Sequence, residues 1–181
     1  MNKMNINDLQ RFQHFKELTS NELQALAQHL EPVNFSAGHE LFHQGDAGDC
    51  VYLLAAGQVE IRVHVPGHDD QVLSNLGEGE IFGEVSLLLH EPRTATALAT
   101  TDIQTWKITR AAFQTAVKQR EAWAIELLIA ISKALAQRLT TVDQQLISII
   151  LDMKEDGHKP QSVKAHELEQ LRNRLFTQWS F

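Results

Sequence analysis

The residue types most able to do chemistry gather in one short stretch, from Gly83 to Thr94. Gly83 has no Cβ, so backbone can approach a ligand closely there, and the amides that follow would face an anion at the start of a short helix. Glu84 can accept a hydrogen bond from a sugar hydroxyl, and Arg93 carries a permanently charged planar fork that matches two phosphate oxygens. The Thr94 hydroxyl lies beside that arginine in the sequence. Together these residues predict a site for a sugar phosphate.

Each residue also has an ordinary explanation when it is taken alone. Gly83 fits a turn, Glu84 a solvated carboxylate and Arg93 a surface charge on a strand. A Gly-Glu pair with an Arg-Thr pair beginning nine residues after Glu84 is less ordinary as a set. Spacing alone nevertheless leaves both interpretations open.

The run Phe82-Gly83-Glu84-Val85-Ser86-Leu87, with Arg93-Thr94-Ala95, resembles the phosphate-binding segment of cyclic nucleotide-binding domains. This family includes the catabolite activator protein, protein kinase A regulatory subunits and cyclic-nucleotide-gated channels. A second stretch, Leu41 to Leu54 followed by Gly57, is similar to the family's first glycine-rich strand motif. The resemblance covers about residues 5 to 153.

The resemblance implies an α+β fold, in which an antiparallel, jelly-roll-like β-roll is flanked by N-terminal helices and a long C-terminal helix. It implies that the roll binds cAMP or cGMP, with Glu84 on the ribose 2′-hydroxyl and Arg93 on the cyclic phosphate. The ligand-binding residues expected from it, to which Asp143 is added below, are Gly83, Glu84, Val85, Ser86, Arg93 and Thr94.

Composition fits one domain of ordinary size with an appendage. The chain has 181 residues, of which 43% are hydrophobic, and a formal net charge of −7. No basic stripe that would follow a nucleic acid backbone is evident, so we expect no nucleic acid partner. The only cysteine, Cys50, excludes an internal disulfide and fits a reducing compartment. Because Cys50 begins an apolar run, we expect a buried thiol.

No targeting or membrane-spanning segment is expected. The first eight residues contain no apolar core of a signal peptide. The most apolar stretch, residues 122–136, is interrupted by Glu126 and Lys133 and is too short to cross a bilayer. The sequence therefore predicts a soluble, cytoplasmic protein without a membrane partner.

The hydrophobic pattern changes twice along the chain. Residues 5–30 have helical spacing, and Thr19 with Glu22 forms a potential capping box, so two helices are expected there. From about residue 32 to 108 the period is two, as in Val59 to Val65, and eight of the nine glycines lie between Gly38 and Gly83. This pattern predicts a small antiparallel roll. Its closing strands are expected at residues 94–100 and 103–108.

Histidines in the roll raise a metal-enzyme alternative, because a small roll could be a cupin. His64 and His68 are the nearest candidates, followed by Asp69 and Asp70. They lie at a strand end and in a turn, without the closely paired histidines on one strand that a metal site favours. We therefore favour solvated turn histidines and expect no metal.

A helical pattern returns after Thr109, with a short helix over residues 110–118 and a long one over about 119–153. The long helix carries a heptad seam of Leu128, Leu135, Leu139, Val142, Leu146, Ile149 and Met153. A seam of this length favours a partner helix, so we expect a parallel homodimer through residues 128–153. In the alternative, the seam packs on its own roll, as its first half is expected to do in part.

The domain organisation expected is a cyclic nucleotide-binding domain at residues 1–153 and a short helical extension at 154–181. Transcription factors of the family continue into a helix-turn-helix domain, for which these last residues leave too little room. Ser162 can cap one helix with an apolar face. We expect this face to pack on the dimer; docking a protein partner through residues 162–181 is the second possibility, and binding at a membrane surface the third.

Two positions concern the base of the nucleotide. In related domains, a threonine directly after the arginine of the phosphate-binding segment, here Thr94, often accompanies cGMP binding. Val142 and Asp143 replace the Thr-Ser pair with which the catabolite activator protein contacts adenine, and the Asp143 carboxylate could accept from guanine. Asp143 also suits a solvated position beside the seam, and cAMP is the commoner messenger in bacteria. The preference stays open.

Three functions are compatible with the sequence. The first is a cyclic-nucleotide receptor that couples ligand capture to rearrangement of the long helix and tail. The second is a structural or adaptor protein with constitutively bound nucleotide. The third is an enzyme, such as a phosphodiesterase or a cupin-like metal enzyme, but the segment offers neither a metal pair nor a positioned base. We expect the receptor and no enzymatic activity.

Overall fold

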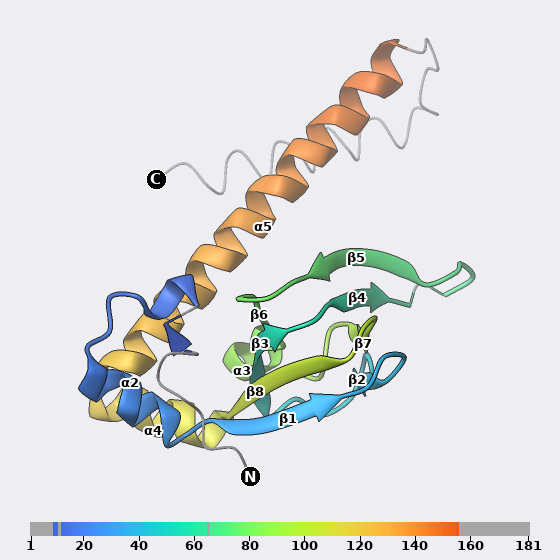
Figure 1. Cartoon of the computed structure of the whole chain (residues 1–181). Helices are drawn as coiled ribbons and strands as arrows, with labels where there is room; N and C mark the ends of the chain where they lie inside the picture. The colour runs from blue at the N-terminus through green and yellow to red at the C-terminus, as the bar shows by residue number, and fades with distance from the viewer. Residues whose placement is uncertain (1–8, 11, 65, 156–181) are drawn as a thin grey trace. The chain divides into compact units, whose positions relative to one another are not determined.

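The computed structural model describes residues 9–10, 12–64 and 66–155. The chain divides into two units, Met1–Ser132 and Lys133–Phe181, and the strands and shorter helices belong to the first (Figure 1). In chain order the elements are η1 (Gln13–Phe15), α2 (Ser20–Ala27), β1 (Glu31–Phe35), β2 (Glu40–Phe42), β3 (Cys50–Ala56), β4 (Val59–Val63), β5 (Gln71–Leu76), β6 (Ile81–Phe82), α3 (Glu84–Leu89), β7 (Thr96–Ala99), β8 (Ile103–Thr109), α4 (Arg110–Gln119) and α5 (Ala122–Glu155). The helix expected after Ser162 lies outside the described residues.

The strands form two four-stranded sheets, ordered β1-β8-β3-β6 and β2-β7-β4-β5. Every pairing is antiparallel. In the first sheet β3 pairs with both β6 and β8, which places Tyr52 opposite Phe82 and Lys107. The α+β prediction of an antiparallel roll with flanking helices is therefore confirmed, including the two closing strands, β7 and β8.

Strand β4 departs from the strict alternation that its sequence predicts. Val59 is buried, but the four residues after it are all partly buried. Glu60 and Arg62 are two residues apart, hence on the same face of the strand, and they form an ion pair. Their aliphatic stems cover part of the outer face, so the difference in burial between the two faces is small.

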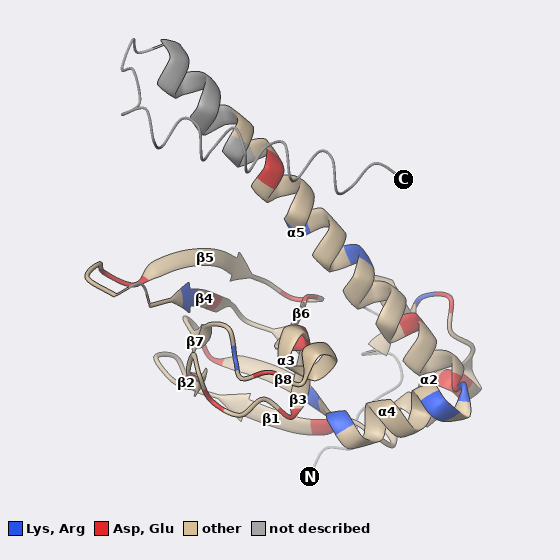
Figure 2. Ribbon diagram, turned by 180° about the vertical axis from the view of Figure 1, so that it is seen from behind, with Lys and Arg blue, Asp and Glu red and all other residues tan. Residues whose placement is uncertain are grey.

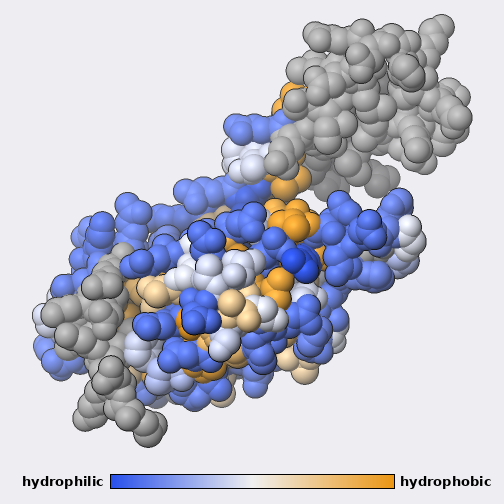
Figure 3. Space-filling view, turned by 45° about the vertical axis from the view of Figure 1, so that its right-hand side comes forward, coloured by the Kyte–Doolittle hydropathy of each residue, from blue (hydrophilic) through white to orange (hydrophobic). Residues whose placement is uncertain are grey.

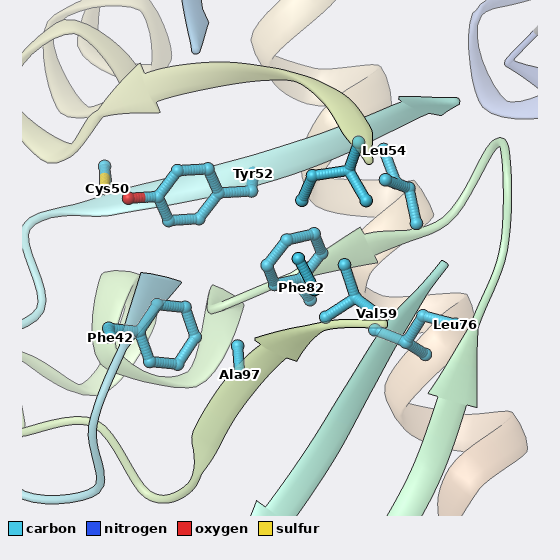
Figure 4. Close-up of a cluster of buried hydrophobic side chains, with 10 residues drawn as sticks. Phe42, Cys50, Tyr52, Leu54, Val59, Leu76, Phe82 and Ala97 are labelled. Atoms are coloured by element: carbon cyan, nitrogen blue, oxygen red, sulfur yellow. The ribbon is translucent and has the colours of Figure 1, made fainter. Parts of the chain in front are cut away.

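The core of the roll lies between the sheets (Figure 4). Its buried members come from strands of both sheets: Phe42, Cys50, Tyr52, Leu54, Val59, Leu76, Phe82, Ala97, Ala99 and Ile103. The Tyr52 ring stacks on those of Phe82 and Phe42, with centroid separations of 5.3 and 6.0 Å, and Phe42 and Phe82 also contact each other at 6.3 Å. Cys50 is a free, buried cysteine, as predicted.

In the N-terminal region the structure describes helix α2 and a 3₁₀ turn at Gln13–Phe15; Leu9 is helical, and most of the first expected helix lies outside the described residues. Phe12, Phe15 and Leu18 are buried, and their amides donate to carbonyls three residues earlier. A spacing of three fits the 3₁₀ helix, which has 3.0 residues per turn. Helix α2 begins with the predicted capping box, in which Thr19 N donates to Glu22 Oε2 (2.7 Å) and Glu22 N donates to Thr19 Oγ1 (3.4 Å).

Helix α5 is continuous from Ala122 to Glu155, which confirms the long helix. Its first turns bury Trp123, Ala124, Leu127, Ala130 and Ile131, and the Trp123 ring stacks on His29 at 5.2 Å. Other large apolar side chains of α5 are exposed: Ile125, Leu128, Ile129, Val142 and Ile147. Figure 3 shows hydrophobic residues at the surface among hydrophilic ones. No helix in the described part of the chain is long and apolar enough to cross a membrane.

Candidate functional site

The site begins where β6 turns into helix α3. Gly83 caps this helix with φ 77° and ψ 12°, a left-handed conformation that glycine adopts without strain. A Cβ at Gly83 would also lie 2.5 Å from Arg93 Nη1. Both the backbone conformation and the close approach therefore require glycine here. Glu84 follows as the first residue of α3 and is buried, with 3% of its surface exposed.

Arg93 reaches this turn from the loop between α3 and β7. Its main chain is held by the β2–β3 loop, because Arg93 N donates to Asp46 O and Gly45 N donates to Arg93 O, both at 2.8 Å. Its guanidinium donates from Nη1 to Gly83 O (2.8 Å) and from Nη2 to Cys50 Sγ (3.3 Å). The residue is only 4% exposed. A charged group thus lies inside the protein at the start of α3.

One nitrogen of this guanidinium lacks a partner. Arg93 Nε is buried, and no atom of the described residues accepts a hydrogen bond from it. An unpaired buried donor costs about 1–3 kcal/mol, and more when it is charged. An anionic oxygen beside Arg93 would satisfy this donor and neutralise part of the charge. A phosphate group supplies such an oxygen and therefore suits this position.

The positive charge also acts on the ionisable groups nearby. A backbone hydrogen bond from His43 lowers the pKa of Asp46, and the charge of Arg93 lowers it further. Burial raises the pKa of Tyr52, as does its hydrogen bond with Cys50, whereas Arg93 opposes the shift. Tyr52 is therefore neutral at physiological pH and offers its ring, not a charge, to the guanidinium.

Gly48, in the β2–β3 loop, is a part of the site that sequence reasoning missed. A Cβ at Gly48 would lie 2.3 Å from Ser86 Cβ and 3.0 Å from Arg93 Nε. The loop therefore packs directly on α3 and on the arginine, at a distance that only glycine permits. Gly48 belongs to the upstream glycine-rich motif, which was a signal for it, although the motif alone did not reveal its partner.

Arg110 is a second residue that the sequence did not reveal. It begins α4, and its Nη2 donates to Ser86 O (2.7 Å) and to Gly48 O. These are main-chain acceptors, which leave no signal in the side-chain types of the sequence. The structure thus brings Gly83, Ser86 and Arg93 together and adds Gly48 and Arg110 to them.

The remaining predicted residues are placed less closely. Val85 is partly buried, and Thr94 is exposed beside Arg93. Asp143 lies on α5 in the second unit, so its role at the site stays a prediction. His64 Nδ1 lies 2.9 Å from Asp70 Oδ1, and His68 is exposed. Among the described residues, no group of three or more His, Cys, Asp and Glu is arranged to hold a metal ion.

Comparisons with known proteins agree with this geometry. Residues 32–120 match the profile of a family described as the cyclic nucleotide-binding domain. A CRP-like cAMP-activated global transcriptional regulator of Mycobacterium tuberculosis is 30% identical over 136 residues, which are 75% of this chain and 59% of that protein. The chain thus matches only about three-fifths of that relative's length.

Solved structures show the same fold. The N-terminal domain of a transcriptional regulator from Streptomyces coelicolor A3(2) superimposes with a TM-score of 0.60 at 30% identity, over 72% of this chain and 93% of that one. A cyclic nucleotide-binding domain from Methylobacillus flagellatus KT, 20% identical, gives a TM-score of 0.70 over 79% of this chain and 80% of that one. The second likeness concerns the fold alone.

Proposed function

The chain belongs to the cyclic nucleotide-binding domain family, and from this premise we propose that it is a receptor for cAMP or cGMP. The observation that carries the proposal is the buried Arg93 guanidinium, whose Nε lacks a partner at the turn that begins α3. In the view of Figure 2, Lys and Arg are interspersed with Asp and Glu along the helices. In this proposal the cation that binds the phosphate is the buried Arg93 side chain.

In the proposed complex, Arg93 binds the cyclic phosphate and Glu84 accepts a hydrogen bond from the ribose 2′-hydroxyl. The cyclic phosphodiester carries one negative charge, which suits a single guanidinium. Charge-assisted hydrogen bonds are about twice as strong as neutral ones, and burial strengthens them further. Gly83 and Gly48 support this assignment because neither position has room for a side chain beside Arg93.

The proposal includes both cAMP and cGMP, because separate observations support each nucleotide. The name of the M. tuberculosis relative, which describes it as cAMP-activated, supports cAMP. Thr94 beside Arg93 and the carboxylate of Asp143 support cGMP, because a hydroxyl and a carboxylate can both bind the guanine edge. Asp143→Ala separates the two, since it should weaken cGMP binding selectively if the carboxylate contacts the base.

We further propose that ligand capture is coupled to rearrangement of α5 and that the protein is a homodimer through this helix. The exposed apolar side chains of α5 support the dimer, because a surface helix normally buries its apolar stripe. Ligand can shift α5 only by binding one arrangement better than another. We propose a binding role without catalysis, since the site supplies a cation and hydrogen-bond acceptors and its arrangement requires no reacting group.

The decisive experiment is calorimetric titration of the purified chain with cAMP and with cGMP. Arg93→Gln should weaken binding about 100-fold or more, because it removes the charge and the fork. Arg93→Lys keeps the charge and loses the fork, so its nucleotide affinity should lie between those of wild type and Arg93→Gln. Arg62→Gln, an arginine of β4 paired with Glu60, is the matched control and should leave affinity unchanged.

Thermal unfolding of each variant checks that the fold is retained. Wild-type protein that binds neither nucleotide, or an Arg93→Gln variant that binds as tightly as wild type, would refute the proposal. Nucleotide that copurifies with the protein and dissociates very slowly would instead favour the structural or adaptor role.

A further inference from the structure

Arg110 stands at the junction of β8 and α4 and contacts two separate segments of the roll. Its main-chain N donates to Asp49 O at 2.6 Å. Its side chain donates from the single nitrogen Nη2 to Ser86 O, at 2.7 Å, and to Gly48 O. One cation therefore connects the β2–β3 loop to helix α3.

Arg93 packs against both of these segments, the β2–β3 loop and helix α3. A Cβ at Gly48 would lie 2.6 Å from Ser86 Oγ and 3.0 Å from Arg93 Nε. The separation of Gly48 from Ser86 therefore determines the space around Arg93 Nε, the nitrogen that lacks a partner. Any widening between the loop and α3 would change the direction in which Arg93 Nε points.

Helix α4 makes a second connection to α3 one turn further on. Gln114 Nε2 lies 2.7 Å from His90 Nε2, at the C-terminal end of α3. Residues 110 and 114 share a face of α4, since they are four apart. The short helix α3, which has six residues, is thus tied to α4 at Ser86 and at its C-cap residue, His90. A helix of this length has little stability of its own.

We propose that Arg110 is a positioning residue of the anion site, which holds the Gly48 loop and α3 at the separation that Arg93 requires. This assignment rests on the proposed function of the site and adds to it a residue outside the phosphate-binding segment. Arg110 does not touch the ligand. It acts through main-chain carbonyls, with charge-assisted hydrogen bonds that a neutral side chain cannot replace.

Calorimetry on three variants of the full chain tests the proposal. Arg110→Met removes the charge and the donors but keeps an unbranched apolar stem, and it should weaken cyclic nucleotide binding about 10- to 100-fold. Arg110→Lys should recover most of this loss, because one ammonium nitrogen can donate to both carbonyls. Phe113→Leu, a buried change on the same helix, should lower stability and leave affinity within about twofold.

An Arg110→Met variant with wild-type affinity would overturn the proposal. So would an Arg110→Lys variant no better than Arg110→Met, or a Phe113→Leu variant that loses as much affinity, since both would indicate a general structural role. The wild-type titration is read first: absence of binding there refutes the proposed function and not this assignment.

Hydrogen–deuterium exchange of the protein without nucleotide decides the matter independently of any ligand. In Arg110→Met, amides of residues 44–49 and 84–90 should exchange faster than in wild type, while those of β4 and β5 should not change. Arg110→Lys should restore the wild-type rates. Unchanged exchange at both segments would show that Arg110 does not hold them.

Discussion

The Arg93 guanidinium lies over the face of the Phe42 ring, with 4.2 Å between Arg93 Cζ and the ring centroid. The Tyr52 ring is the second aromatic neighbour, at 5.9 Å. The face of an aromatic ring is electron-rich and attracts a cation, by up to about 2 kcal/mol when water is excluded. The roll thus holds the Arg93 charge against two aromatic rings of its apolar core.

Phe42→Leu should weaken cyclic nucleotide binding by about 5- to 30-fold, because Arg93 loses the ring that fixes its plane. Phe35→Leu is the matched control, since Phe35 packs against the same core cluster and stacks on His39 at 5.1 Å. Calorimetric titration of both variants measures the effect. Equal affinity of the two variants would mean that the ring serves the core alone.

Gly48→Ala should lower both stability and nucleotide affinity strongly, although it adds only one methyl group. The added Cβ would lie 2.3 Å from Ser86 Cβ, so either the loop or α3 must move. We expect a loss of about 1–3 kcal/mol in the free energy of unfolding, as in other overpacked sites, together with weakened nucleotide binding. Urea denaturation and calorimetry measure the two effects.

Gly77→Ala provides the control for that substitution. An added Cβ there would meet only Glu80 Oε2, at 4.0 Å, and Gly77 does not have a positive φ. Its stability should stay within about 0.5 kcal/mol of wild type. If Gly48→Ala were equally well tolerated, the close packing of the β2–β3 loop on α3 would be wrong.

Sequence patterns predicted the parts of this molecule that depend on side-chain type. The period of two, with its glycines, identified the roll, and the capping box located the start of α2. The Gly83-Glu84 pair and Arg93 identified residues that the fold brings to one turn. These features follow from local geometry, which neighbouring residues determine.

The features that the sequence did not predict depend on contacts between parts of the chain that are distant in sequence. Arg110 binds main-chain carbonyls, and any residue type has such a carbonyl, so neither Gly48 nor Ser86 could be recognised as its partner. The stacking of Arg93 on Phe42 is set by the pairing of strands β2 and β7. The 3₁₀ turn at Gln13–Phe15 could not be told from α-helix in the sequence, because apolar spacings of three occur in both.

Tyr52 should make the protein sensitive to alkaline pH. Burial raises its pKa above the ordinary value of about 10, so above that pH the unfolded chain loses a proton that the folded protein retains. The unfolded state then binds fewer protons, and the free energy of unfolding falls by up to about 1.4 kcal/mol per pH unit. Below about pH 10 this contribution does not vary.

Because Tyr52 is the only tyrosine in the chain, its ionisation can be followed directly by ultraviolet absorbance. The folded protein should show no tyrosinate at a pH where the urea-unfolded chain is half ionised. In Tyr52→Phe, the decline of stability above about pH 10 should be shallower. Ionisation of Tyr52 at the ordinary pKa in the folded protein would contradict its burial against Cys50 and Arg93.

The seam on α5 makes a prediction about assembly. Val142 lies on this seam, and 57% of its surface is exposed in the single chain. In a parallel homodimer the two copies of Val142 would face each other, so Val142→Glu would bury two like charges and should weaken dimerisation about 100-fold or more.

Sedimentation equilibrium measures this effect, and Gln137→Glu is the control. It makes the same charge change at an exposed position of α5 off the seam. We expect dimers for wild type and for Gln137→Glu, and monomers for Val142→Glu. A monomeric wild type, or a Val142→Glu variant that still dimerises, would mean that the exposed apolar side chains of α5 do not mediate self-association. Circular dichroism should show helix loss in the Val142→Glu monomer, because an isolated amphipathic helix keeps little of its structure without packing.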